Sequence, residues 1–214
     1  MSYFAFTPSP HLQQQIQHIF NQRHHSEALY PLRNALILQM NDEIVAQLLT
    51  GLIQRLPASE KRNIAEKLAH TVQSTVHTLL NQLLGKADND TVQQSLAFVE
   101  RSQFQGTQAI GFHLPADFVA QMLQFYQQIL QEQSVDVSAL AQHYKTFASA
   151  LIQHFMIDFN HTLGLGLIKR KASDLAAATV IKAVHLAIDK IIPHLQHDEL
   201  KILANYHQQF FVQA

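Results

Sequence analysis

The chain contains no cysteine and no tryptophan, and only six glycines and six prolines occur among its 214 residues. The lack of cysteine excludes disulfide bonds, thiol catalysis, thiolate-bound zinc and iron–sulfur clusters. No window approaches ~18 consecutive apolar residues, so we expect no membrane span. The first eight residues lack a basic start and an apolar core, so we expect no signal peptide and a soluble protein of the cytoplasm.

Charge is also scarce. Charged residues make up 14% of the chain and the net charge is −1, whereas globular proteins usually carry about a quarter charged residues. Glutamine and histidine supply the polarity instead, with 27 and 14 copies. A protein that binds nucleic acid normally has a basic excess, so nucleic acid is not an expected partner.

The remaining pattern is helical. Asn-Gly, Asp-Gly and Gly-Gly dipeptides are absent and no long run alternates apolar with polar residues, which argues against β-hairpins. Apolar residues instead recur with the helical period, and glycine or proline stands where helices should end. We therefore predict an all-α fold of about eight helices in a predominantly antiparallel bundle. The expected helices are 10–23, 27–56, 58–85, 88–103, 115–133, 136–163, 173–193 and 197–211.

One segment, 104–114, breaks this pattern because Gly106, Gly111 and Pro115 interrupt it. It is expected to be irregular, and it is the one plausible joint between two domains. No internal repeat or linker supports such a split. The prediction is a single helical domain over 1–214, with a subdivision near 104–114 as the alternative.

The first candidate site is His154-x3-Asp158-x2-His161. Positions i, i+4 and i+7 share one face of a regular helix, and this spacing places Asp158 inside the apolar stripe with both histidines on its edge. Two imidazoles and a carboxylate suit zinc, iron or manganese, or a polar ligand. The alternative is a structural Asp–His pair at a helix seam. No second ligand half is found, which favours that alternative.

The second candidate pairs Asn41 with Asp42, which both intrude on the apolar stripe of the long helix 27–56. Such breaks of the binary pattern cluster at functional sites. A helix break with Asn41 as the cap of a new helix is the alternative, and we favour it slightly. A pairing of Asp42 with His154 or His161 would favour a site instead.

The third candidate is an anion site at 164–171. Two glycines, Gly164 and Gly166, precede the cations Lys169, Arg170 and Lys171 just before a helix, and helix N-termini attract anions. The spacing matches no known phosphate-binding motif. A solvated turn with a basic surface is the favoured alternative, in which Leu165, Leu167 and Ile168 pack inward.

No catalytic constellation is recognised, so we expect a non-enzymatic protein. Helix 173–193 is apolar around much of its circumference, and pockets between such helices are mostly apolar. The leading hypothesis is a helical module that binds a small apolar ligand or a protein partner, with a homodimer as a further option. The alternatives are a metal- or haem-binding protein using His154, Asp158 and His161, and an interaction protein without a pocket. No cofactor or metal is identified.

Overall fold

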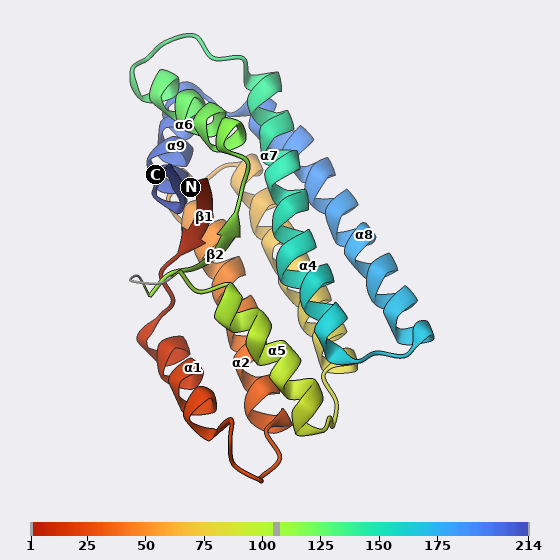
Figure 1. Cartoon of the computed structure of the whole chain (residues 1–214). Helices are drawn as coiled ribbons and strands as arrows, with labels where there is room; N and C mark the ends of the chain where they lie inside the picture. Colours follow the sequence, from red (N-terminus) through yellow and green to blue (C-terminus); the bar gives the residue numbers. More distant parts are fainter. Residues whose placement is uncertain (1, 105–107, 214) are drawn as a thin grey trace.

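The structure is a computed structural model that describes residues 2–104 and 108–213. It is predominantly helical, which confirms the predicted fold class (Figure 1). The helices are α1 (Pro10–Gln22), α2 (Tyr30–Val45), α3 (Gly51–Ile53), α4 (Glu60–Leu83), α5 (Asn89–Arg101), α6 (Ala116–Leu130), α7 (Val137–Ile152), α8 (Leu167–Ile191) and α9 (His197–His207). The strands are β1 (Ser2–Phe6), β2 (Ile110–His113) and β3 (Phe211–Gln213).

Polar caps set the starts of several helices. The side chains of Ser9, Ser59, Asp88 and Asp136 each accept a hydrogen bond from the backbone N–H three residues on. These bonds satisfy donors that the first helical turn leaves free. The sequence indicated a cap at Ser9, at Asp88 or Asp90, and at Asp136 or Ser138, and the structure has Ser9, Asp88 and Asp136 as the caps.

The small sheet was not predicted. Its order is β2-β1-β3 with both pairs antiparallel, so Phe4 lies opposite Phe112 on one side and Phe211 on the other. A Cβ atom at Gly111 would collide with the Phe4 carbonyl, so only glycine permits this pairing. The expectation of an irregular 104–114 is therefore wrong at β2, while Gly106 lies outside the described residues. Strands this short show no clear alternation, and their partners lie far apart in sequence.

One hydrophobic cluster includes residues from both sides of 104–114, from Phe4 to Phe211. At its centre, the Phe4 ring contacts the rings of Phe112, Phe147, Phe210 and Phe211. The two ends of the chain and its middle thus meet around a single aromatic side chain. The strands β1 and β3 lie beside α6, and α8 runs next to α4 and α7 (Figure 1).

The long helix is continuous through Asn41 and Asp42, so the helix break favoured there is wrong. Its irregularity comes later, as a π-helical segment (Ala46–Thr50) that leads into α3. The stretch Tyr30–Ile53 has the length and composition of a membrane span, but half of its most apolar window is buried inside the fold. It also carries the buried polar residues Arg33 and Glu43, as a central helix of a folded core can.

The start of α8 also differs from the prediction. The sequence indicated a cap at 173–174, but α8 begins at Leu167 with Gly166 as its N-cap. Ser173 lies inside the helix, is buried, and accepts a hydrogen bond from Asn160 at 2.6 Å. Helix α8 packs against α4 and α7 and forms one edge of the molecule (Figure 1).

Candidate functional site

A pocket of about 190 Å³ lies between α2, its π-helical continuation, α4, α7, α8 and the C-terminal helix α9. Apolar side chains form nearly all of its wall; examples from the facing helices are Leu48, Val72, Phe147, Leu151, Val184 and Ile188. For comparison, an apolar cavity of roughly 150 Å³ in another protein stays dry and binds benzene. The pocket therefore has the size and lining to hold a small apolar molecule.

Three polar residues line this pocket: Asn41, Tyr144 and His207. Asn41 differs from the other two because its side-chain nitrogen is buried and has no hydrogen-bond partner in the part of the chain that the structure describes. A buried donor without a partner costs about 1–3 kcal/mol. One residue of the mostly apolar wall thus carries a buried amide nitrogen whose N–H groups have no partner in the described chain.

A chain of hydrogen bonds occupies Tyr144 and His207. The hydroxyls of Tyr126 and Tyr144 lie 2.9 Å apart, Tyr144 reaches His207 Nδ1 at 2.8 Å, and His207 Nε2 reaches the Leu48 carbonyl at 3.1 Å. Since a carbonyl can only accept, Nε2 carries the proton, so Nδ1 accepts from Tyr144 and Tyr144 accepts from Tyr126. Burial lowers the pKa of His207 to about 4 and raises those of both tyrosines. All three groups are therefore neutral at pH 7.

The π-helical segment Ala46–Thr50 supplies the last acceptor of this chain, the Leu48 carbonyl. A π turn shifts the regular backbone pairing, and such turns are frequent at functional sites. Here the carbonyls of Gln47 and Leu48 accept hydrogen bonds from Tyr206 and His207, neighbours on α9. A second π-helical segment (Gln153–Asp158) contributes Phe155 to the pocket wall. Both π segments of the described chain thus border the pocket.

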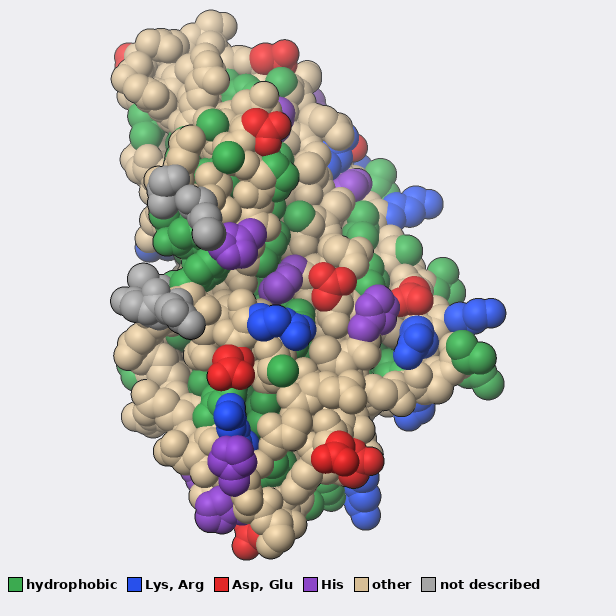
Figure 2. Space-filling view, viewed as in Figure 1, with side chains coloured by type: hydrophobic (Ala, Val, Ile, Leu, Met, Phe, Trp, Pro, Cys, Tyr) green, Lys and Arg blue, Asp and Glu red, His purple; other side chains and the backbone are tan. Residues whose placement is uncertain are grey.

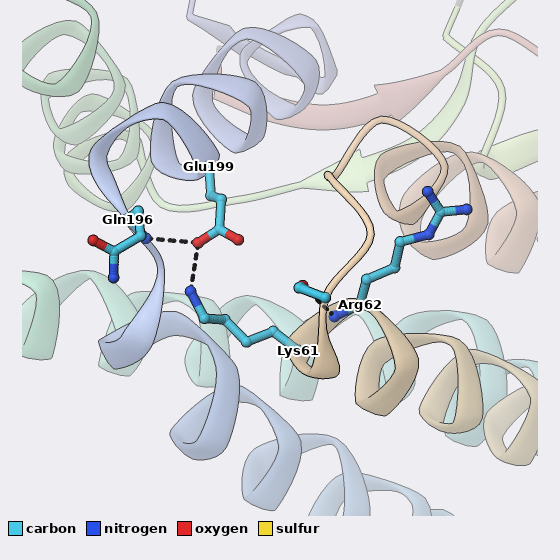
Figure 3. A network of polar contacts seen from close by, with 5 residues as sticks. Lys61, Arg62, Gln196 and Glu199 are labelled. Carbon is cyan, nitrogen blue, oxygen red and sulfur yellow. Dashed lines mark hydrogen bonds and ion pairs between the residues drawn. The ribbon is translucent and has the colours of Figure 1, made fainter.

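An ion pair joins the first turns of α4 and α9 (Figure 3). Lys61, in the first turn of α4, lies 2.6 Å from Glu199 of α9, and the same carboxylate oxygen accepts from the backbone N–H of Gln196 at 2.7 Å. Burial alone would raise the pKa of Glu199, but these two hydrogen bonds and the Lys61 charge lower it overall. The neighbouring Ala65 and Leu195 line the pocket, so the pair fixes the helix ends around it.

The proposed His154–Asp158–His161 face does not form a cluster. The described residues contain no group of three or more His, Cys, Asp or Glu side chains that could hold a metal. His154 Nε2 instead lies 2.9 Å from Ser102 Oγ, its ring stacks on Phe112, and burial lowers its pKa to about 4. Asp158 accepts from Gln153 at 2.7 Å, and His161 is exposed.

The reason is the helix geometry. The shared face assumes 100° per residue, but 153–158 is π-helical and His161–Leu163 is a 3₁₀ turn, so the angular step changes twice.

The second candidate pair separates into two environments. Asn41 faces the pocket, whereas Asp42 accepts from Gln73 at 3.3 Å and lies 3.8 Å from His77, both on α4. The pairing with His154 or His161 that would have favoured a site is not formed, because the partners of Asp42 are Gln73 and His77. Asn41 alone therefore belongs to the apolar pocket.

At the third candidate, Gly164 adopts φ 61°, and Gly166 precedes an exposed Lys169, Arg170 and Lys171. Leu167 and Ile168 were expected to pack inward, yet they are 76% and 87% exposed. Because α8 starts at Leu167, these two side chains lie in the first turn of the helix and extend into solvent. The expected packing is therefore wrong for both.

Sequence reasoning missed Tyr144 and His207 as pocket residues. They meet across helices far apart in the chain, and no spacing rule connects them. Comparison of the chain with protein-family models, curated proteins and solved structures gives no match. The function is therefore argued from the site itself.

Proposed function

We propose that this chain is a non-enzymatic binding protein for a small, mostly apolar molecule held in the pocket between α2, α4, α7, α8 and α9. The observation that carries the proposal is an almost wholly apolar pocket with one buried donor, Asn41 Nδ2, that has no partner in the described chain. Ligand pockets typically combine apolar walls with a few polar groups that fix orientation.

The polar groups also indicate the chemistry of the ligand. Asn41 offers an N–H donor, so a ligand with a carbonyl or ether oxygen would satisfy it. No charged side chain is among the residues that line the pocket, and His207 and Tyr144 are neutral and hydrogen-bonded to each other. A neutral ligand is therefore favoured, because an ion would lose its hydration without gaining a counter-charge. An interaction protein without a pocket would need none of this arrangement.

The direct test is titration of the untagged protein with the neutral apolar dye N-phenyl-1-naphthylamine, followed by its fluorescence. Ala148 is buried in the pocket wall, so Ala148→Phe should fill the space and abolish dye binding. Ala178 is exposed on α8, and Ala178→Phe is the matched control that should bind as the wild type does. Absence of saturable binding, or equal binding by both variants, would contradict the proposal.

Asn41→Leu tests the role of the lone donor. The change removes an unsatisfied buried group, so the empty protein should become more stable by about 1 kcal/mol in urea unfolding. The preference for an aryl ketone over the hydrocarbon of the same shape, measured by dye displacement, should fall about tenfold, since 1.4 kcal/mol is a factor of ten. An unchanged preference would show that Asn41 does not contact the ligand.

A further inference from the structure

A second, open pocket lies at the other end of α2 and has a different character. It is bordered by the loop after α4, by the turn before α8 and by Arg33 of α2. Its charged lining residues are Arg33, Lys86 and Lys169, and no acidic side chain is among the residues that border it. All charged side chains that line this pocket are thus cations, although the net charge of the chain is −1.

Arg33 is the unusual member. It is 2% exposed, and its hydrogen-bond partners are all neutral: Asn34 Oδ1 at 2.7 Å, the Gly85 carbonyl at 3.3 Å and Ser95 Oγ at 3.5 Å. Within residues 2–104 and 108–213, no carboxylate lies within ion-pair distance of it. A guanidinium has five N–H donors, so these three bonds leave two unused. A buried charge without a counter-ion is costly, and it points to an anion that completes the site.

The N-terminus of α8 adds further donors to the same pocket. Its N-cap is Gly166, which has no side chain to cap the backbone N–H groups of Leu167, Ile168 and Lys169. The first turn carries two cations, Lys169 and Arg170, and no acidic residue, although the helix dipole favours negative charge there. An anion at this position would offset both effects.

We propose that this pocket binds a phosphate group, held by Arg33, Lys86, Lys169 and the first N–H groups of α8. A planar guanidinium fork, ammonium groups and a helix N-terminus are the donors that phosphate oxygens prefer. The inference is independent of the apolar pocket, because the two sites share no lining residue.

The rim of the site carries exposed apolar side chains beside the cations. Leu167 and Ile168 line the pocket. Among the large apolar side chains of the described residues, these two are the most exposed. Hydrophobic and basic side chains lie together along the edge of the molecule that α8 forms (Figure 2). Exposed apolar side chains beside cations are typical of surfaces that meet anionic lipid. The phosphate chemistry is the same for free phosphate and for a lipid headgroup, so the experiment must separate these sources.

The first measurement is calorimetric titration with inorganic phosphate, against chloride at equal ionic strength. We expect Lys169→Gln to weaken binding about tenfold, since a charge-assisted hydrogen bond contributes about 1.5 kcal/mol. Arg33→Met should abolish binding, and circular dichroism checks that this variant is folded. Lys182→Gln is the matched control, because Lys182 is exposed on α8 but lies outside the pocket.

The second measurement is co-sedimentation with vesicles of phosphatidylcholine alone and of phosphatidylcholine mixed with phosphatidic acid. Ile168→Ser should reduce binding to the acidic vesicles about tenfold, because it removes an exposed apolar side chain beside the cations. Phosphate binding without vesicle binding would support the site with free phosphate as the source. No binding of either, or equal losses in Lys169→Gln and Lys182→Gln, would overturn the proposal. Ala148→Phe should bind phosphate normally, so failure of the apolar pocket is distinguishable.

Discussion

Three polar side chains with buried nitrogen atoms show different solutions to the same physical problem. Among residues 2–104 and 108–213, His207 has a partner on each ring nitrogen and is neutral, Asn41 has a free amide donor, and Arg33 has neutral partners but no counter-charge. A fully bonded neutral group costs little to bury, whereas the other two leave a cost that a ligand can offset. The incomplete residues are therefore the ones we assign to binding.

His207 makes the protein sensitive to acid. Its pKa is about 4 in the folded chain and 6.5 without burial, so the unfolded chain binds more protons between these values. The His207 contribution is complete above pH 6.5 and is lost as the pH falls toward 4. A shift of this size corresponds to roughly 3 kcal/mol. Urea unfolding from pH 7 to pH 4 should show this loss, with an added contribution from His154, whose pKa is also about 4.

His207→Gln should be less stable at pH 7 but show a flatter pH dependence, because glutamine does not titrate. His70→Gln on the exposed face of α4 is the control and should keep the wild-type slope. If His207→Gln retained the full slope, the acid sensitivity would have another source.

At the residue scale the sequence was partly informative. Asn41 could be recognised because a polar residue interrupted an apolar stripe, and it lines the pocket. Arg33 could not, because nothing local distinguishes a buried arginine from an exposed one. His207 and Tyr144 depend on a contact between α7 and α9, which periodicity does not predict.

At the scale of elements, the helices follow the sequence pattern closely but their internal phase does not. Apolar spacing, caps and prolines predicted most helix limits within a few residues. The apolar spacing did not reveal the two π-helical segments. A π turn inserts a residue into the helix, so residues before and after it no longer lie on the face that a regular helix would give them. This shift explains why His154, Asp158 and His161 do not share a face.

Gly51 tests whether the first π segment depends on its contact with α9. A Cβ atom there would collide with the Tyr206 hydroxyl, which bonds to the Gln47 carbonyl. In an ordinary helix Gly→Ala stabilises by about 1 kcal/mol. We expect Gly51→Ala instead to destabilise by about 1–2 kcal/mol in urea unfolding, because that hydrogen bond is lost.

Gly85→Ala is the matched control, since no atom lies within 4 Å of a Cβ built there. It should change stability little. Hydrogen exchange at 46–50 should accelerate in Gly51→Ala alone, and a stabilised Gly51→Ala would show that α9 does not hold the π turn.

At the scale of the whole molecule, the sheet joins segments that local rules treat separately. β1 and β3 come from the two ends of the described chain and β2 from its middle, so their pairing depends on long-range contacts. The sequence predicted a helical bundle and missed this closure. Its consequence is that residues near the C-terminus stabilise the N-terminal strand.

Phe211 is where this closure can be measured. It is buried, and its ring contacts Phe4 of β1, Tyr126 of α6 and Phe147 of α7. Removal of a core phenylalanine costs about 3–5 kcal/mol, a large part of the 5–15 kcal/mol that typically holds a domain together. Phe211→Ala should lower the urea midpoint accordingly and accelerate hydrogen exchange in β1, at the opposite end of the chain. Phe118→Ala, at a half-buried ring on α6, should cost less and leave exchange in β1 unchanged. Equal effects of the two changes would mean that β3 adds no more to the stability of the fold than an ordinary packing contact does.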